Sequence, residues 1–322
     1  MKIAVIGAGG VGGYFGGLLA RAGHDVAVVA RGPHLTAIRE HGLQVHDVEG
    51  DFTAAVTASD EPADLGPRQV VLFCVKSYDT QAAASRLGPL VAADTAVLSL
   101  QNGIDNEEKI AAAVGPDHVL GGAAFIFSSI TEPGVITRAS GPARIAFGEL
   151  DGSRSARVER LLAACRGAGI EAEVPTDIRT VLWSKLAFIC GVAGMTAAVR
   201  RPLGEIRDCA ESWAMLRRIV AEVAELARAE EVPLAADVVD EQCTFAAGLP
   251  SGSYSSLHHD LVTGRRMELD ALHGAVVRRA ARRRVVVPAN QAIHAVLRPW
   301  MLRNEAATAA GPDADSARPQ VN

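Results

Sequence analysis

A glycine-rich turn within the first 12 residues constrains the fold more than any other feature of the chain. Residues 2–7, KIAVIG, form a short apolar run typical of a buried strand, and residues 14–24, YFGGLLARAGH, have helical spacing with a glycine near the end. Between them, Gly7, Gly9 and Gly12 have the GxGxxG spacing. In such a turn the first glycine permits a tight bend, the second admits a pyrophosphate, and the third lets helix and strand pack closely. The sequence therefore predicts a dinucleotide-binding strand, turn and helix.

The end of the second predicted strand indicates which dinucleotide binds. Residues 25–31, DVAVVAR, end at Arg31, where an NAD site usually has Asp or Glu to bind the ribose 2'-hydroxyl. An arginine can pair with a 2'-phosphate, so we predict NADP (NADPH) as the cofactor. A surface arginine without this role is the alternative. The cofactor-binding residues predicted in this region are Gly7, Gly9, Gly10, Val11, Gly12 and Arg31.

Further apolar runs predict the rest of the fold. They lie at residues 70–76, 96–103 and 119–125, and the helix-length connections between them indicate a parallel sheet covered on both faces. Residues 135–148 alternate around a Ser-Gly-Pro turn, which predicts an antiparallel pair at the sheet edge. We predict an α/β fold with an N-terminal Rossmann-type doubly wound sheet, followed by an all-helical C-terminal domain. The predicted boundaries are 1–176 for the first domain, 177–304 for the second and 305–322 for a disordered tail.

Composition favours small-molecule chemistry. The net charge of -5 over 322 residues gives no general attraction to nucleic acid or to anionic membranes. The chain has no basic leader and no apolar run that approaches membrane-spanning length, and its five cysteines lack CxxC spacing. We therefore expect a cytoplasmic protein with reduced core cysteines. No metal is predicted, because His258 and His259 are consecutive and point in different directions. The oligomeric state stays open, with a homodimer as one expectation.

Lysine is rare in this chain, so a lysine inside an apolar segment stands out. Only four of the 32 basic residues are lysines. In the helix predicted from Asp177 onward, Lys185 lies on an apolar stripe, one turn from Ile189. Burial lowers the pKa of an amine, which suits it to donate a proton near neutral pH. A lysine whose stem packs while its amine reaches water is the alternative.

Several motifs together resemble the ketopantoate reductase (2-dehydropantoate 2-reductase) family, over residues 1 to about 300. They occur in the family's order: GAGGVGG, VKSYDT, LQNGIDN, WSKL, SYSSLHHDLVTGRRMELDALHGAVV and VPAN. The resemblance implies NADPH-dependent reduction of a 2-oxo acid to a 2-hydroxy acid, with 2-dehydropantoate and (R)-pantoate in pantothenate biosynthesis as the family's pair. It also implies an active site between a Rossmann domain and a helical domain.

The same resemblance assigns roles to single residues, and it makes Lys185, Glu268 and Asn102 the predicted catalytic residues. Lys185 matches the family's general acid. Asn102 matches a residue beside the nicotinamide and the substrate oxygen, and Lys76 matches a cofactor-side lysine. Ser256 matches a contact to the substrate carboxylate. Glu268, expected in the first turns of a helix, matches a contact to Lys185 or to the ribose. From the residues alone, a turn asparagine and solvated helix positions remain alternatives.

One departure from the family concerns the substrate. Family members that act on ketopantoate usually carry asparagines four and eight residues after the lysine, whereas this chain has Ile189 and Ala193. Without two amide contacts, the substrate-binding face is more apolar, and a buried substrate hydroxyl or carboxylate is less well satisfied. A related, more apolar 2-oxo acid is therefore an alternative to ketopantoate.

Two other functions stay open. A 3-hydroxyacid dehydrogenase-type enzyme also combines a Rossmann domain, a helical domain and a lysine, but its lysine usually follows a glycine-rich helix start, whereas TVLW precedes this one. A non-catalytic NADPH-sensing protein would have no need to retain Lys185, Asn102 and Glu268.

Overall fold

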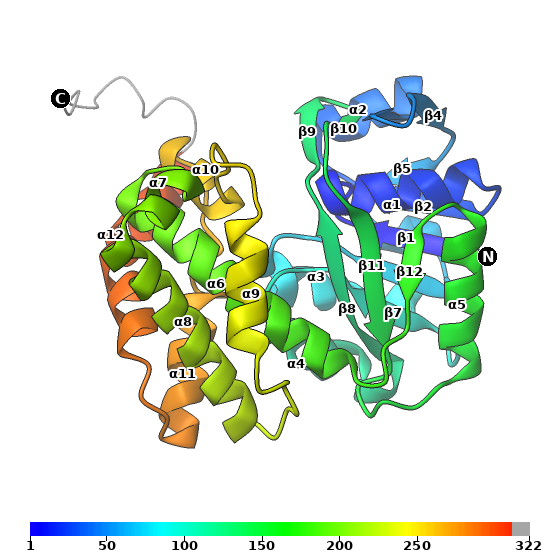
Figure 1. The fold of residues 1–322 in the computed structure, drawn as a ribbon. Helices are drawn as coiled ribbons and strands as arrows, with labels where there is room; N and C mark the ends of the chain where they lie inside the picture. Colours follow the sequence, from blue (N-terminus) through cyan, green and yellow to red (C-terminus); the bar gives the residue numbers. More distant parts are fainter. Residues whose placement is uncertain (311–322) are drawn as a thin grey trace. The chain divides into compact units, whose positions relative to one another are not determined.

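The computed structural model describes residues 1–310, which form two compact units (Figure 1). Unit 1 is Met1–Leu182, and unit 2 comprises the described residues from Trp183 onward. The boundary lies inside helix α6 (Ile178–Val199), a few residues beyond the boundary predicted at residue 177. The predicted fold class is confirmed, because unit 1 contains a largely parallel sheet and all described elements after residue 173 are helical.

The large sheet of unit 1 has eight strands in the order β12-β11-β8-β7-β6-β1-β2-β5. Their bounds are β1 (Lys2–Ile6), β2 (Asp25–Val29), β5 (Thr57–Ser59), β6 (Val70–Phe73), β7 (Ala96–Ser99), β8 (Val119–Ile126), β11 (Ala143–Gly148) and β12 (Glu171–Glu173). Along the run β8-β7-β6-β1-β2-β5, each strand pairs with its neighbour in parallel. In contrast, β11 pairs with β8 antiparallel. The sheet therefore has a mixed edge, although its antiparallel strands, β8 and β11, are not the pair that the sequence predicted.

Both faces of this sheet are covered, because its strands alternate between two apolar cores. Ile3 and Val5 face a core that includes α1, α2 and α5, while Ala4 and Ile6 face one that includes α3 and α4. These helices are α1 (Gly10–Arg21), α2 (Gly32–His41), α3 (Thr80–Ala84), α4 (Asn106–Val114) and α5 (Ala156–Gly167). Four short 3₁₀ helices connect them: η1 (Pro62–Leu65), η2 (Ser77–Asp79), η3 (Gly88–Leu90) and η4 (Pro116–His118).

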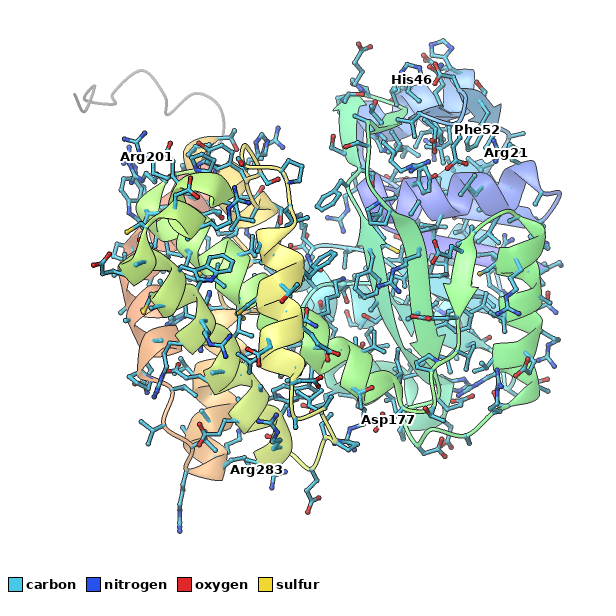
Figure 2. All side chains as sticks on the ribbon, in the orientation of Figure 1. Arg21, His46, Phe52, Asp177, Arg201 and Arg283 are labelled. Atoms are coloured by element: carbon cyan, nitrogen blue, oxygen red, sulfur yellow. The ribbon has the colours of Figure 1, made fainter. Side chains whose placement is uncertain are left out.

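A second sheet packs against α1 and corrects one prediction. Its order is β4-β3-β10-β9, with β3 (Leu43–Asp47), β4 (Phe52–Ala54), β9 (Ser129–Glu132) and β10 (Val135–Arg138). The antiparallel pair predicted over residues 135–148 is wrong, since β10 pairs with β3 and β9 whereas β11 pairs with β8 and β12. The chain changes sheets at the Ser-Gly-Pro segment. At β4, an edge strand of the second sheet, the Arg21 guanidinium of α1 lies 4.1 Å from the centre of the Phe52 ring (Figure 2).

A buried ion pair joins two strands of the second sheet. Arg138 donates from Nε and Nη2 to the two oxygens of Asp47, over 3.1 and 2.6 Å, and both side chains are 4% exposed. Burial raises the pKa of Asp47, but the hydrogen bonds from Arg138 and Tyr14 outweigh this and hold the pKa below its ordinary value. The carboxylate is therefore charged in the folded protein at neutral pH.

Unit 2 is built from helices. Beside the greater part of α6, they are α7 (Leu203–Asp208), α8 (Ala210–Ala229), α9 (Val238–Ala247), α10 (Ser256–Val262), α11 (His273–Arg283) and α12 (Pro288–Ala310). Prolines and positive-φ residues mark the breaks, as at Arg284, which ends α11 in the left-handed conformation just after Arg283 (Figure 2). The helical domain was predicted to end at residue 304, whereas α12 continues to Ala310. The rest of the predicted tail lies outside the described residues.

A buried polar network fixes α8, α11 and α12 to one another. The Glu222 carboxylate, 1% exposed, accepts the backbone N–H groups of Ala289 and Asn290 at 3.0 Å each, and so caps α12 from a neighbouring helix. Asn290 donates its side-chain amide to Glu222 and accepts from His273 Nδ1 at 2.9 Å. Burial lowers the pKa of His273 to about 4, which keeps its imidazole neutral at neutral pH.

Helix α6 and one cysteine differ from the sequence predictions. By length and composition alone, the 22 residues of α6 would be enough to cross a membrane, so the prediction that no segment approaches that length is wrong. However, 67% of its most apolar window is buried within the protein, as in the core helix of a globular unit. All five cysteines are free thiols, but Cys209 is exposed rather than in the core.

Candidate functional site

The predicted cofactor residues of unit 1 follow four neighbouring strands that end at one edge of the large sheet. The last residues of these parallel strands form one row: Val29, Ile6, Phe73 and Ser99. The segments that leave the sheet from this row carry Arg31, the Gly7–Gly12 turn, Lys76 and Asn102, in that order. Ligands of open α/β sheets bind outside the carboxyl ends of the strands, and this edge is therefore the candidate cofactor site.

The three motif glycines in the turn between β1 and α1 differ in how closely their neighbours approach them. Gly7 has a φ of +95°, and a Cβ on it would lie 2.9 Å from the backbone nitrogen of Val75. A Cβ on Gly12 would overlap the carbonyl oxygen of Gly7, so helix and strand are in close contact there. In contrast, a Cβ on Gly9 would meet no described atom within 4 Å. The turn is thus closely packed at its first and third glycines and open at the second.

The N-terminus of α1 offers backbone donors beside this open space. Gly9 is the N-cap residue of α1, and no side chain of the described residues caps the helix there. In an α helix the first N–H groups have no intrahelical acceptor, and they carry the positive end of the helix dipole. The N–H groups of Gly10, Val11 and Gly12 are therefore placed as in helices that bind phosphate. The residues present fit a dinucleotide.

Arg31 lies two positions after Val29, whose carbonyl oxygen is hydrogen-bonded to this turn. It is exposed and forms the N-cap of α2, two residues after the end of β2, and the first turn of α2 has no acidic residue. The N–H groups of Gly7 and Ala8 both donate to the carbonyl oxygen of Val29, at 3.2 and 3.3 Å. Only Ala30 separates Val29 from Arg31. The arginine is therefore held near the Gly7–Gly12 turn, which we call the phosphate turn. An exposed guanidinium at this strand end fits a 2'-phosphate.

The segment that carries Asn102 is held by side chains that the sequence analysis did not single out. Gln101, 5% exposed, donates from Nε2 to the carbonyl oxygen of Val75 at 2.7 Å and to the Thr80 hydroxyl at 2.8 Å. Asn106 donates to the carbonyl oxygen of Asn102 at 2.9 Å. The bonds of Gln101 tie the LQNGIDN segment to the VKSYDT segment, and the bond of Asn106 closes the turn within LQNGIDN.

Lys76 lies within the second of these tied segments. It is exposed at the start of η2. Gln101, Asn106 and Thr80 all belong to the two motifs that the sequence singled out. The sequence does not show which of these side chains pair, because their partners lie up to 26 residues away along the chain.

In unit 2, three of the predicted residues share one face of α6. Lys185 is followed at steps of four residues by Ile189 and Ala193, a spacing that places all three along one side of a helix. Ile189 is half-buried and Ala193 is buried. Neither side chain can donate or accept a hydrogen bond, so the positions that follow the lysine on this face are apolar.

Ser256 is the first residue of α10 and is exposed. The preceding Ser255 caps the helix by accepting the His258 N–H at 3.1 Å. The Thr196 hydroxyl donates to the Val192 carbonyl at 2.7 Å, so the Ser255 hydroxyl is the donor in its 2.8 Å bond with Thr196. The start of α10, and Ser256 with it, is thereby attached to α6.

The position predicted for Glu268 is wrong. This residue is buried but lies in the irregular segment between α10 and α11, and not in the first turns of a helix. Its carbonyl oxygen accepts the N–H groups of Ala271 and Leu272, at 3.1 and 3.2 Å, in a turn that comes before α11. Apolar residues at three- and four-residue spacing occur in such a turn as well as in a helix, which is why the pattern placed the helix start too early.

Comparisons with known proteins agree with this architecture. Residues 3–152 match the family model described as Ketopantoate reductase PanE/ApbA, and residues 177–300 match the one described as its C-terminal part. A 2-dehydropantoate 2-reductase of Halobacterium salinarum is 37% identical over 89% of this chain and 95% of its own length. One of Caulobacter vibrioides is 32% identical, over 92% and 98%. The crystal structure of a PanE/ApbA family ketopantoate reductase from Ralstonia eutropha superposes with a TM-score of 0.87 at 34% identity, over 95% of this chain and all of that one.

Proposed function

The chain belongs to the ketopantoate reductase family, and from this premise we propose that it reduces a 2-oxo acid to the 2-hydroxy acid with NADPH. The observation that carries the proposal is the carboxyl edge of the large sheet in unit 1. There, an open phosphate turn and an exposed arginine follow adjacent strands. A nicotinamide dinucleotide with a 2'-phosphate has the charges that match both features.

The reaction needs a hydride and a proton. The nicotinamide cofactor supplies the hydride to the carbonyl carbon when it is bound. Lys185 is the proposed acid that gives a proton to the carbonyl oxygen as that oxygen becomes a hydroxyl. Asn102 is the proposed neighbour of the nicotinamide and the substrate oxygen, Ser256 the contact to the substrate carboxylate, and Glu268 the partner of Lys185 or of the ribose.

The substrate is 2-dehydropantoate or a related, more apolar 2-oxo acid. The relatives of Halobacterium salinarum and Caulobacter vibrioides favour the first. The face of α6 favours the second, because Ile189 and Ala193 provide no hydrogen bond for a substrate hydroxyl.

The test is steady-state oxidation of NADPH and of NADH with a panel of 2-oxo acids, including 2-dehydropantoate and the same acid without its hydroxyl. We expect turnover with NADPH. The Arg31→Ala variant should lower the preference for NADPH over NADH by about 10- to 100-fold, the worth of hydrogen bonds to a charged group.

Two results would contradict the proposal. Tight NADPH binding without turnover of any 2-oxo acid would favour the sensing function, and an unchanged cofactor preference in the Arg31→Ala variant would remove the 2'-phosphate assignment.

A further inference from the structure

His34 lies one turn after Arg31 in α2, and both nitrogens of its imidazole are hydrogen-bonded. Nε2 lies 2.8 Å from the carbonyl oxygen of Ala8, and the backbone nitrogen of Gly134 lies 2.9 Å from Nδ1. A carbonyl oxygen can only accept and a backbone N–H can only donate. Nε2 therefore carries the proton and Nδ1 is the acceptor, so the neutral imidazole in this tautomer satisfies both partners.

The Ala8 contact connects His34 to the phosphate turn. Ala8 is held on both sides of its backbone, because its N–H donates to Val29 at the end of β2 while its carbonyl accepts from His34. Val29 precedes Arg31 and His34 follows it. The phosphate turn is thus bonded to both ends of the short segment that carries the arginine.

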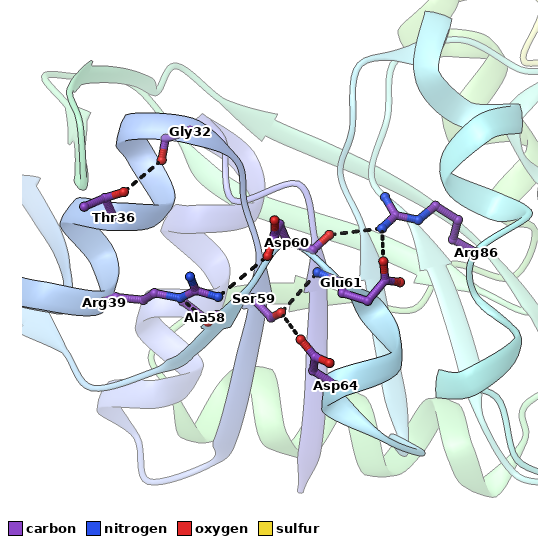
Figure 3. A network of polar contacts seen from close by, with 9 residues as sticks. All are labelled: Gly32, Thr36, Arg39, Ala58, Ser59, Asp60, Glu61, Asp64 and Arg86. Atoms are coloured by element: carbon purple, nitrogen blue, oxygen red, sulfur yellow. Dashed lines mark hydrogen bonds and ion pairs between the residues drawn. The ribbon is translucent and has the colours of Figure 1, made fainter.

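Figure 3 shows other side-chain contacts of α2, made by Thr36 within the helix and by Arg39 to residues 58 and 60. Arg39 donates from Nε to the carbonyl oxygen of Ala58 at 3.0 Å, and its Nη2 lies 3.7 Å from the Asp60 carboxylate. These bonds hold the C-terminal half of α2 to β5 and the residue after it. Among the described residues of α2, His34 makes the side-chain hydrogen bond that reaches the phosphate turn.

We propose that His34 is a positioning residue for cofactor discrimination, which fixes the spacing between the phosphate turn and Arg31. The inference rests on the proposed NADPH function and deepens it. A ligand that is bound at its pyrophosphate and at its 2'-phosphate gains affinity when both binding points are held at the right distance in advance. A ligand without the 2'-phosphate does not use Arg31 and gains less from that spacing.

The test measures binding without substrate, by titration calorimetry of the full chain with NADP+ and with NAD+. His34→Ala and His34→Leu should each raise the Kd for NADP+ about 5- to 30-fold more than the Kd for NAD+, since a lost hydrogen bond has that order of effect. His34→Gln, whose amide has a donor and an acceptor, should recover part of the difference. His41→Ala, an exposed histidine near the end of the same helix, should change neither constant.

A double-mutant cycle separates this inference from the function on which it rests. With Arg31→Ala as the background, His34→Leu should no longer change the ratio of the two Kd values, because the arginine is already absent. If Arg31→Ala itself leaves the ratio unchanged, the 2'-phosphate assignment fails. If Arg31→Ala lowers the discrimination but His34→Leu weakens both ligands equally, the positioning role is overturned. The leucine keeps the side-chain volume, so it provides the test if the alanine variant does not fold.

Discussion

Replacing Glu222 with alanine removes the carboxylate that caps α12 from α8. In the folded protein this carboxylate accepts two backbone N–H groups of the first turn of α12 and the side-chain amide of Asn290, each at 3.0 Å. It also accepts from Arg218 at 3.1 Å, but that arginine is 60% exposed, so its bond contributes little. The variant leaves donors without their acceptor inside unit 2.

The expected cost follows from these contacts. Loss of a helix cap costs about 1 to 2 kcal/mol, and the unmet amide of Asn290 costs about 1 kcal/mol, since it keeps a 3.3 Å bond to Ile219. The space left by the deleted side-chain carbons costs about 1 to 2 kcal/mol more. We expect the free energy of unfolding to fall by about 3 to 5 kcal/mol in Glu222→Ala. Glu222→Gln should lose less, because one of its side-chain atoms still accepts.

The assay is urea unfolding followed by tryptophan fluorescence. All three tryptophans, Trp183, Trp213 and Trp300, lie in unit 2, so the signal reports on the unit that contains the network. Glu225→Ala is the matched control, because Glu225 is exposed on the same helix and its loss should change stability by no more than about 0.5 kcal/mol. A Glu222→Ala variant within about 1 kcal/mol of this control would refute the reasoning.

Three further predictions concern catalysis, substrate choice and pH. Lys185→Ala should lower kcat about 10²- to 10⁴-fold, and Lys185→Arg should not restore it because a guanidinium does not release its proton; an alanine variant with near-normal kcat in NADPH oxidation would reject the role. Ile189→Asn/Ala193→Asn should raise the kcat/KM ratio of 2-dehydropantoate over the acid without its hydroxyl by about 10-fold or more. A wild-type ratio already above about 10² would contradict the apolar-substrate hypothesis. The pKa of Asp47 is lower in the folded protein than its ordinary value of 3.8, so the ionised carboxylate stabilises the fold at pH values above 3.8. This stabilisation is lost as the pH falls through the lower pKa of the folded state. Asp47→Asn should therefore be less stable by about 3 kcal/mol at neutral pH and show a shallower loss in acid unfolding, and parallel pH profiles for the two proteins would count against it.

Local patterns in the sequence determined much of the fold and part of the site. Strand and helix positions follow from the spacing of apolar residues, and the cofactor turn follows from glycines required by close approach and positive φ. These properties depend on residues near one another in the chain. The carboxyl ends of parallel strands lie at the same edge of a sheet. A parallel sheet predicted from the apolar runs therefore already places the segments of Lys76 and Asn102 at the edge that carries the phosphate turn.

The tertiary structure alone decided which distant residues pair. Residues 135–138 and 143–148 have the pattern of a hairpin, but they do not pair with each other. The first segment pairs with β3 in the second sheet, and the second pairs with β8 in the large sheet. Alternation shows that a segment can form a strand without showing with which strand it pairs. His34 in the same way bonds to Gly134, 100 residues away, and Glu222 caps a helix that begins more than 60 residues later. Such hydrogen bonds form only when folding brings the two groups together, so these long-range contacts are determined by the tertiary structure.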